Sequence, residues 1–429
     1  MRKRITSLKL QAMVDLSKTP RVSICLPSYN HAQYLPAAID SILRQTYQDF
    51  EIIIVDDGSS DRSLEIAEEY ALRHPSRILV LTHPEHRNLG ISETVNLAYR
   101  HCRGEYWSGL PSDDMLVPYK LERQVAFLDA NPKLGWVYSY ARPVDDAGQL
   151  VTEFPSFGRD ITKDKHPLRR LIHNNAIPGM SVLMRRSCTE KVGLHDQSLL
   201  YSDWEFWLRM TAQCPVAFLD DHLVLHRVHG YNTSGNIEPH ENMRRALEVM
   251  LTFRAKAEAV KTLAIDARTL ALIDLQSSFY SFCLGQQPEA THSLDAAFQT
   301  DPTLTGDGKF FIAWLREKIF ELTYTFEPLS PERTFASWVR NSLPSAALAS
   351  LTHRVAAAEL AQAALNIRET DLNAARRLSL NCLKLDPSWL LDQSLRYALL
   401  ESFFGKTLMK TARHLSQASR KRLARRLAV

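Results

Sequence analysis

The first half of this chain alternates short apolar runs with amphipathic helical patterns, and this alternation limits the possible folds more than any other feature. Four strand-like runs end in polar segments, and segments with helical spacing of apolar residues lie between them. Such alternation predicts an α/β fold with a doubly wound, mostly parallel sheet. The strand-like runs are residues 22–26, 51–55, 77–83 and 105–110.

Polar residues follow the first two predicted strands, at the carboxyl ends where such sheets bind ligands. Tyr29 follows the first strand, and its ring can lie against a flat base or sugar, although packing on the sheet edge explains it equally well. Asp56 follows the second strand, where a carboxylate can accept a base N–H or a ribose hydroxyl, while Asp-Gly-Ser is also ordinary turn chemistry. No GxGxxG pattern occurs here, which disfavours a dinucleotide site.

The next two strand ends carry further polar groups. Asn88 and Gly90 allow a tight turn before a helix whose N-terminus suits phosphate. Asp113 and Asp114 are adjacent carboxylates, and a divalent cation such as Mg²⁺ or Mn²⁺ would cancel their repulsion. The alternative is that Asp113 is a helix N-cap and Asp114 favours the helix dipole.

Two downstream segments hold candidates for proton transfer and anion binding. Asp203 and Glu205 lie in an apolar, aromatic helix pattern, where a carboxylate is either capped and paired or tuned to abstract a proton. Arg209 is a candidate structural partner. Arg227 suits a diphosphate and His229 suits a metal or a phosphate, although histidines at a strand end are more often structural.

In their order along the chain, these motifs closely resemble the family 2 inverting glycosyltransferases with the GT-A fold. The resemblance covers residues 21–234, about half of the chain. It rests on the segments VSICLPSYN, SILRQTYQDFEIIIVDDGSSD, NLGISETVNLAYRHCRGEYWSGLPSDD, SVLMRR, VGLHDQSLLYSDWEFWLRM and HRVH.

The resemblance implies a nucleotide-sugar donor, with a UDP-sugar favoured, a bound Mn²⁺ or Mg²⁺, and one displacement that inverts the anomeric carbon. It also implies a glycan or lipid-linked acceptor, used in surface polysaccharide or lipopolysaccharide synthesis. Transferred to this sequence, the family pattern places donor-binding residues at Pro27, Tyr29, Asp56, Asp57, Asn88, Gly90, Asp113 and Arg227, metal ligands at Asp113, Asp114 and His229, and the general base at Asp203.

Three positions depart from the family pattern. Pro111 stands where an acidic residue is often found, so fewer carboxylates lie near the predicted metal. Ser202 stands where a glutamate often precedes the base, and Val95 stands where many members have an arginine. The last two bear on the details of donor and acceptor binding.

Strand signals fade after residue 238, and helical patterns dominate to the end. We expect four parts: a lead-in at 1–20, a GT-A domain at 21–237, a helical domain at 238–405 and a basic tail at 406–429. Residues 290–302 and 375–387 both begin with Ala and end with Asp-Pro. They indicate helix-pair packing, with a TPR-like repeat as the minority interpretation.

The tail has eight Lys/Arg and no Asp or Glu, and it is compatible with an amphipathic helix on an anionic membrane surface. A solvated basic helix or a disordered terminus is the alternative. The net charge of +4 is small for 429 residues, so no nucleic acid partner is expected. Six scattered cysteines without CxxC indicate buried thiols in a reducing compartment. We expect a cytoplasmic protein, at most peripheral to the inner face of the cell membrane.

Two other functions compete with this interpretation. A nucleotidyltransferase on the same fold needs a Gly-rich, basic loop after the first strand, and PSYNHAQY is not one. The second is an interaction protein built on the helical half, with a catalytically weak sugar-nucleotide-binding domain.

Overall fold

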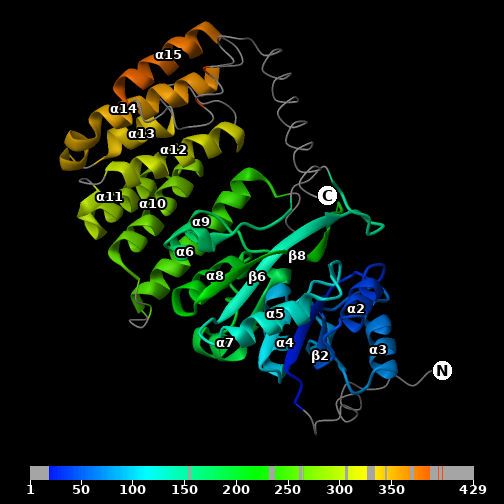
Figure 1. The fold of residues 1–429 in the computed structure, drawn as a ribbon. Helices are drawn as coiled ribbons and strands as arrows, with labels where there is room; N and C mark the ends of the chain where they lie inside the picture. Colours follow the sequence, from blue (N-terminus) through cyan, green and yellow to red (C-terminus); the bar gives the residue numbers. More distant parts are fainter. Residues whose placement is uncertain are drawn as a thin grey trace, which may run out of the picture. The chain divides into compact units, whose positions relative to one another are not determined.

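The computed structural model describes residues 19–152, 156–230, 237–259, 263, 265–304, 308–325, 334–343, 345–367, 372–386, 395 and 399. By its internal contacts the chain divides into two compact units, one up to Gln276 and one from Ser277 onward. Figure 1 shows the sheet in the first unit and helices alone in the second.

The first unit is built on an eight-stranded sheet with the order β3-β2-β1-β4-β7-β6-β8-β5. Neighbouring strands from β3 to β4 are parallel, as are β6 and β8, whereas β7 is antiparallel to both its neighbours and β5 is antiparallel to β8. The predicted fold class, a doubly wound and mostly parallel sheet followed by helices, is confirmed. The strands are β1 (Val22–Ser28), β2 (Phe50–Asp56), β3 (Ile78–Thr82), β4 (Tyr106–Gly109), β5 (Met115–Leu116), β6 (Trp136–Val144), β7 (Leu183–Arg185) and β8 (Val216–Arg227).

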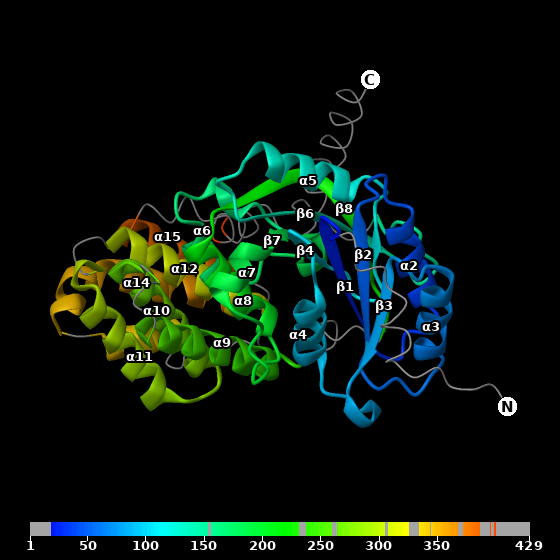
Figure 2. The ribbon, with the colours of Figure 1, turned by 90° about the horizontal axis from the view of Figure 1, so that it is seen from below.

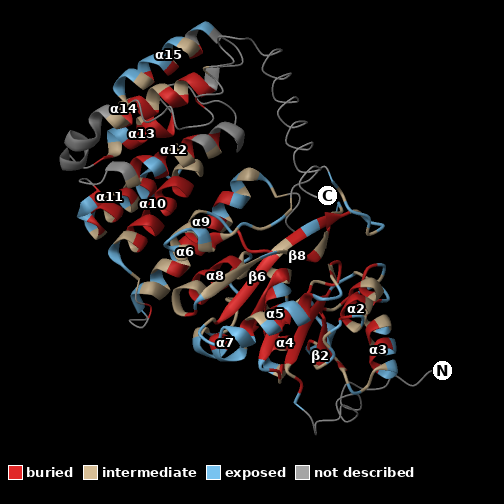
Figure 3. Cartoon of the chain, viewed as in Figure 1, coloured by how far each residue is buried: buried red, intermediate tan, exposed pale blue. Residues whose placement is uncertain are grey.

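The central strands are buried on both faces, which explains their continuous apolar runs. Figure 2 shows α4 (Ile91–His101) on one side of β1 to β3, and α2 (Leu35–Leu43) and α3 (Ser63–Arg73) on the other. In α2 the buried residues Leu35, Ala38, Ile39 and Ile42 follow helical spacing and face the core. Figure 3 shows the resulting buried layer along the sheet.

The register of the sheet aligns the ends of its first strands. Ser28 at the end of β1 pairs with Asp56 at the end of β2, and Asp56 pairs with Thr82 at the end of β3. The polar segments that follow these strands therefore start from the same edge of the sheet.

The rest of the first unit is helical. α8 (Ser202–Gln213) buries Trp204, Phe206, Trp207 and Leu208, as its aromatic pattern indicates. The other elements are α5 (Lys120–Ala130), α6 (Pro167–His173), α7 (Arg186–Val192), α9 (Pro239–Ala259), the first part of α10 (Ala267–Cys283), and the 3-10 helices η1 (Pro84–His86), η2 (Ile161–Lys163) and η3 (Gly179–Ser181).

The second unit packs its own aromatic core around Phe335, whose ring contacts Phe279, Phe282, Trp314 and Trp338. Its described helices are the end of α10, α11 (Gln287–Thr300), η4 (Pro302–Leu304), α12 (Gly308–Thr325), α13 (Phe335–Ser342), α14 (Ser345–Ile367) and α15 (Leu372–Leu385).

Several expectations for the C-terminal half stay predictions. The change from strands to helices falls at Pro239, beside the expected boundary at 237/238, whereas the contacts divide the chain at Gln276. Asp301-Pro302 follows α11, but the matching proline after α15 and the basic tail at 406–429 lie outside the described residues.

Among the described residues, no helix combines the length and the apolar character that a membrane crossing requires. The six cysteines are free thiols, and five of them are buried, as their scatter through apolar runs indicates.

Candidate active site

The end of β2 presents a buried carboxylate that is only partly satisfied. Asp56 is fully buried, and its Oδ2 accepts a hydrogen bond from the Ser59 amide at 3.0 Å. Its Oδ1 has no hydrogen-bond partner among the described residues. Because a buried carboxylate oxygen without a donor is costly, this atom is a natural acceptor for a ligand N–H or O–H.

The neighbouring Asp57 is occupied by the protein itself. Its carboxylate accepts hydrogen bonds from the amides of Leu89 at 2.7 Å and Gly90 at 3.0 Å. Gly90 has a φ of +85°, which favours glycine, and α4 begins directly after it. Asp57 therefore holds the turn that starts α4, and donor-binding roles for Asp57, Gly90 and the exposed Asn88 stay predictions.

The residues at the end of β1 and directly after it differ sharply in exposure. Pro27 is buried within the strand, whereas the Tyr29 side chain is 47% exposed. Asn30 has a left-handed backbone with a φ of 52°, and its side chain accepts a hydrogen bond from the Ser60 amide at 2.8 Å. This arrangement leaves the Tyr29 ring accessible, as stacking on a base requires.

Three side chains at this edge could hold a metal ion. One ligand atom each from His31, Asp113 and His229 lie within 4.8 Å of one another. His229 Nε2 lies 3.2 Å from Asp113 Oδ2, and His31 Nδ1 lies 2.8 Å from the Ser112 hydroxyl oxygen. His31 was not predicted from the sequence. Its only signal was its place two residues after Tyr29, in the segment that follows the first strand.

Asp114 is turned to different partners from those of Asp113. Its Oδ1 accepts hydrogen bonds from the His226 ring and the Arg227 amide, both at 2.9 Å, and its Oδ2 is buried without a partner among the described residues. Burial raises the pKa of Asp114. Asp114 thus ties the segment before β5 to the end of β8, and its predicted role as a metal ligand stays a prediction.

The helix-cap interpretation of Asp113 is wrong. The residues after it, Met115 and Leu116, form the short strand β5, and α5 begins only at Lys120. The pairing of β5 with β8 explains the difference, because this pairing places Met115 opposite Leu225.

Arg227 supports the main chain around this cluster. Its guanidinium donates hydrogen bonds to the carbonyl of Asp113 at 3.0 Å and to those of Asp145 at 2.9 Å and Asp146 at 2.6 Å. It also lies over the Tyr34 ring, 4.8 Å from the centroid. A diphosphate-binding role for Arg227 stays a prediction.

Tyr34 connects Arg227 with the metal-site cluster. Its ring stacks on His229 at 5.0 Å, and its hydroxyl donates to Asp146 Oδ1 at 2.7 Å. A cavity of about 660 Å³ lies beside these groups, lined in part by Tyr34, Asp146, Arg227 and His229.

Asp203 lies in the first turn of α8, half-buried and held by two hydrogen bonds. Its Oδ1 accepts from the Trp204 amide at 2.7 Å and its Oδ2 from the Asn175 side chain at 3.0 Å. Burial raises the pKa of Asp203, against the effect of both hydrogen bonds. A positioned carboxylate with a raised pKa is suited to accept a proton from a substrate hydroxyl.

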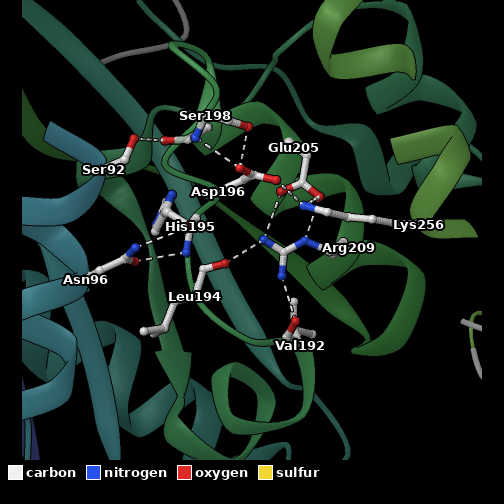
Figure 4. A network of polar contacts seen from close by, with 11 residues as sticks. Ser92, Asn96, Val192, Leu194, His195, Asp196, Ser198, Glu205, Arg209 and Lys256 are labelled. Atoms are coloured by element: carbon white, nitrogen blue, oxygen red, sulfur yellow. Dashed lines mark hydrogen bonds and ion pairs between the residues drawn. The ribbon is translucent and has the colours of Figure 1, made fainter. Parts of the chain in front are cut away.

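The second carboxylate of this motif is structural. Glu205 is fully buried, and its two oxygens accept hydrogen bonds from Arg209 at 2.7 and 2.8 Å. Figure 4 shows that Lys256 of α9 also reaches this group; its Nζ lies 3.1 Å from Glu205 and 2.7 Å from Asp196. Arg209 in turn donates to the carbonyls of Val192 and Leu194. The network holds α8 against the segment before it.

A cavity of about 260 Å³ joins Asp203 to the strand ends. Pro27 from the end of β1 and Pro111 after β4 line it, together with Asp203 from α8. The fold thus brings the predicted base to the same cavity as a predicted donor-binding residue far from it in sequence.

The Glycosyl transferase family 2 model matches residues 23–193 of this chain. An uncharacterized glycosyltransferase of Rickettsia typhi is 31% identical over 219 residues, which are 50% of this chain and 66% of that protein. Chondroitin synthase of Escherichia coli is 29% identical over 222 residues, 51% of this chain and 30% of the synthase. The matches therefore span just under two thirds of the first relative and under a third of the second.

Among solved structures, that of S. aureus TarS is similar with a TM-score of 0.49 and 16% sequence identity. The alignment covers 86% of this chain and 55% of TarS.

Proposed function

Because this chain belongs to glycosyl transferase family 2, with a helical region after its GT-A-type sheet, we propose that it transfers a sugar from a nucleoside-diphosphate donor to a hydroxyl group. The acceptor is a glycan or a lipid-linked molecule, and the anomeric carbon is inverted. The observation that carries the proposal is the cavity in which Asp203 faces the same space as the ends of β1 and β4.

The donor nucleoside binds at the ends of β1 and β2. The unpartnered Oδ1 of Asp56 accepts a hydrogen bond from the base or ribose, and the exposed ring of Tyr29 stacks on the base. Asp57 supports this surface through the turn at Gly90. A UDP-sugar is the donor that we would test first.

The diphosphate binds beside Asp113, where His31 and His229 complete a candidate metal site. Two imidazole nitrogens and one carboxylate oxygen suit Mn²⁺ better than Mg²⁺, which prefers oxygen ligands. When bound, the cation offsets the charge that develops on the leaving diphosphate. Asp114 and Arg227 hold Asp113 and His229 in place from the side of β8.

Asp203 is the general base. Its carboxylate takes the proton of the acceptor hydroxyl while the hydroxyl oxygen forms a bond to the anomeric carbon. The bond from that carbon to the diphosphate oxygen breaks on the opposite face, so the nucleoside diphosphate leaves with its electron pair and the configuration inverts. Asn175 and the Trp204 amide fix the carboxylate in this orientation.

The Asp203→Asn variant tests this assignment. We expect transfer to fall by roughly 10²- to 10⁴-fold, the usual contribution of a general base, while donor binding persists. The amide nitrogen at position 203 would face Asn175, whose own amide must turn and give up its weak 3.4 Å contact with the Ile177 amide, so the fold should tolerate the change.

The measurement combines product formation from a panel of nucleotide sugars with thermal shifts on adding UDP and Mn²⁺. Glu190→Gln is the matched control, because Glu190 is an exposed carboxylate on α7 paired only at the surface with Arg186. Loss of donor binding in a folded Asp203→Asn protein would contradict the base assignment. A wild type that no nucleoside diphosphate stabilises would contradict the proposed function itself.

A further inference from the structure

The cavity at Asp203 is apolar over most of its lining. Ile91, Val95 and Tyr99 of α4 form one wall, and Met180 and Trp207 lie on other elements around it. Its volume of about 260 Å³ is slightly below the usual range for small-molecule sites, so it holds a part of an acceptor and not a whole one.

Few other polar groups that line this cavity are open to a ligand: among the described residues, the indole N–H of Trp207 is a buried donor without a hydrogen-bond partner. The hydroxyls of Ser92 and Ser202 lie 2.7 Å apart and bond to each other. The His195 ring stacks on Phe206 at 4.3 Å, and burial lowers the pKa of His195 to about 3, so the ring is neutral. A further sugar ring, belonging to the acceptor, would bury several hydroxyls in this cavity with few groups to bond them, which is unfavourable.

The rim of the same cavity exposes large apolar side chains. Ile91 is 53% exposed and Leu200 is 57% exposed, and both line the cavity that contains Asp203. Leu89, two residues before Ile91, is 43% exposed. Apolar side chains gathered at the mouth of a site indicate an apolar ligand group that covers them.

We propose that the acceptor carries its reactive hydroxyl next to an alkyl chain, as in a lipid-type acceptor, and that this chain lies between Ile91, Val95 and Leu200 with the hydroxyl at Asp203. This inference rests on the proposed function, since Asp203 must be the base. The inference narrows the proposed acceptors, a glycan or a lipid-linked molecule, to the lipid-linked class. In such an acceptor the part nearest the attacking oxygen is hydrocarbon and not a further sugar.

The experiment compares the binding of 1-octanol and of methanol to the full-length protein, because both carry their hydroxyl on hydrocarbon and not on a sugar ring. Binding is measured calorimetrically in the presence of UDP and Mn²⁺, at concentrations at which 1-octanol stays dissolved. We expect 1-octanol to bind at least tenfold more tightly than methanol, because covering a leucine-sized apolar surface is worth about that much.

The Ile91→Ser/Leu200→Ser double variant should lose most of this difference in affinity between 1-octanol and methanol. Both side chains are more than half exposed, so the fold should persist, which circular dichroism checks. Leu72→Ser is the matched control, since Leu72 is 50% exposed on α3 and does not line the cavity. It should keep the wild-type difference in affinity.

Two results would overturn the proposal of an apolar acceptor. One is equal binding of 1-octanol and methanol, and the other is an equal loss of the difference in affinity in Leu72→Ser, which would mean non-specific binding of the alkyl chain. Slow hydrolysis of the nucleotide sugar without acceptor is followed separately. If the wild type consumes donor but binds both alcohols equally, only the acceptor inference fails. If it neither binds nucleoside diphosphate nor consumes any donor, the proposed function fails as well.

Discussion

Replacing Asn175 with alanine should make catalysis more sensitive to acid. The Asn175 side chain donates a hydrogen bond of 3.0 Å to Asp203 Oδ2, and this bond favours the ionised carboxylate. Burial already raises the pKa of Asp203. Without the hydrogen bond the pKa rises further, so the base is lost to protonation at a higher pH than in the wild type.

The size of the effect follows from the exposure of the pair. A hydrogen bond to a charged group is worth about 1.5–3 kcal/mol. Because Asn175 is exposed, water can hydrogen-bond to Asp203 in the variant and offset part of this loss. A loss of about 1 kcal/mol corresponds to a roughly fivefold lower kcat/KM on the acid limb, with no loss at high pH, where the carboxylate is ionised in both proteins.

The assay is the pH profile of kcat/KM for the best donor, because its acid limb reports the base of the free enzyme. Asn174→Ala is the control, since Asn174 is also exposed and immediately precedes Asn175. A profile lowered equally at every pH would indicate a structural defect. An acid limb that stays in place would refute the claim that this hydrogen bond acts on the base.

Three further predictions concern metal binding and stability. His31→Ala should weaken Mn²⁺ binding at least tenfold, measured by paramagnetic resonance of the free ion, and unchanged binding would exclude His31 as a ligand. Lys256→Met should lower the free energy of unfolding, measured with urea at pH 7, by about 1–2 kcal/mol. Burial works to raise the pKa of Asp196, but hydrogen bonds from Lys256 and Ser198 outweigh it and lower this pKa to about 2. The destabilisation by Lys256→Met should therefore shrink at pH 3 and below, as the Asp196 carboxylate becomes protonated. Burial lowers the pKa of Lys120 to about 7. Above pH 7 the unfolded chain therefore binds more protons than the folded protein, so the free energy of unfolding of the wild type should rise by about 2 kcal/mol between pH 7 and pH 9. The Lys120→Met variant should lack this rise.

The strand pattern was predictable because each strand is locally marked. A strand buried on both faces needs a continuous apolar run, and all four predicted runs are strands of the sheet. Parallel strands in register then bring their polar ends to one edge, so the position of Asp56 near the first strand end followed from the same pattern.

The roles within paired motifs were less predictable. Asp113 and Asp114 are neighbours in sequence, yet one faces His229 and the other bonds His226 and the Arg227 amide. Asp203 and Glu205 share one helical turn, yet the carboxylate of Glu205 accepts hydrogen bonds from Arg209 and Lys256. No local pattern separates such neighbours, because most of their partners lie 28 to 116 positions away in the sequence.

By itself, the amino-acid sequence determined the alternation of strands and helices, the edge of the sheet at which polar groups gather, and the family resemblance. These depend on local periodicity and on motif order. Only the tertiary structure decided that His31 lies beside Asp113 and His229. The same holds for the hydrogen bond from Lys256 of α9 to Glu205, in the helix that carries Asp203, and for the apolar cavity beside the proposed base. Those features arise where distant segments meet, and side-chain direction and burial there are set by packing, which no short stretch of sequence encodes.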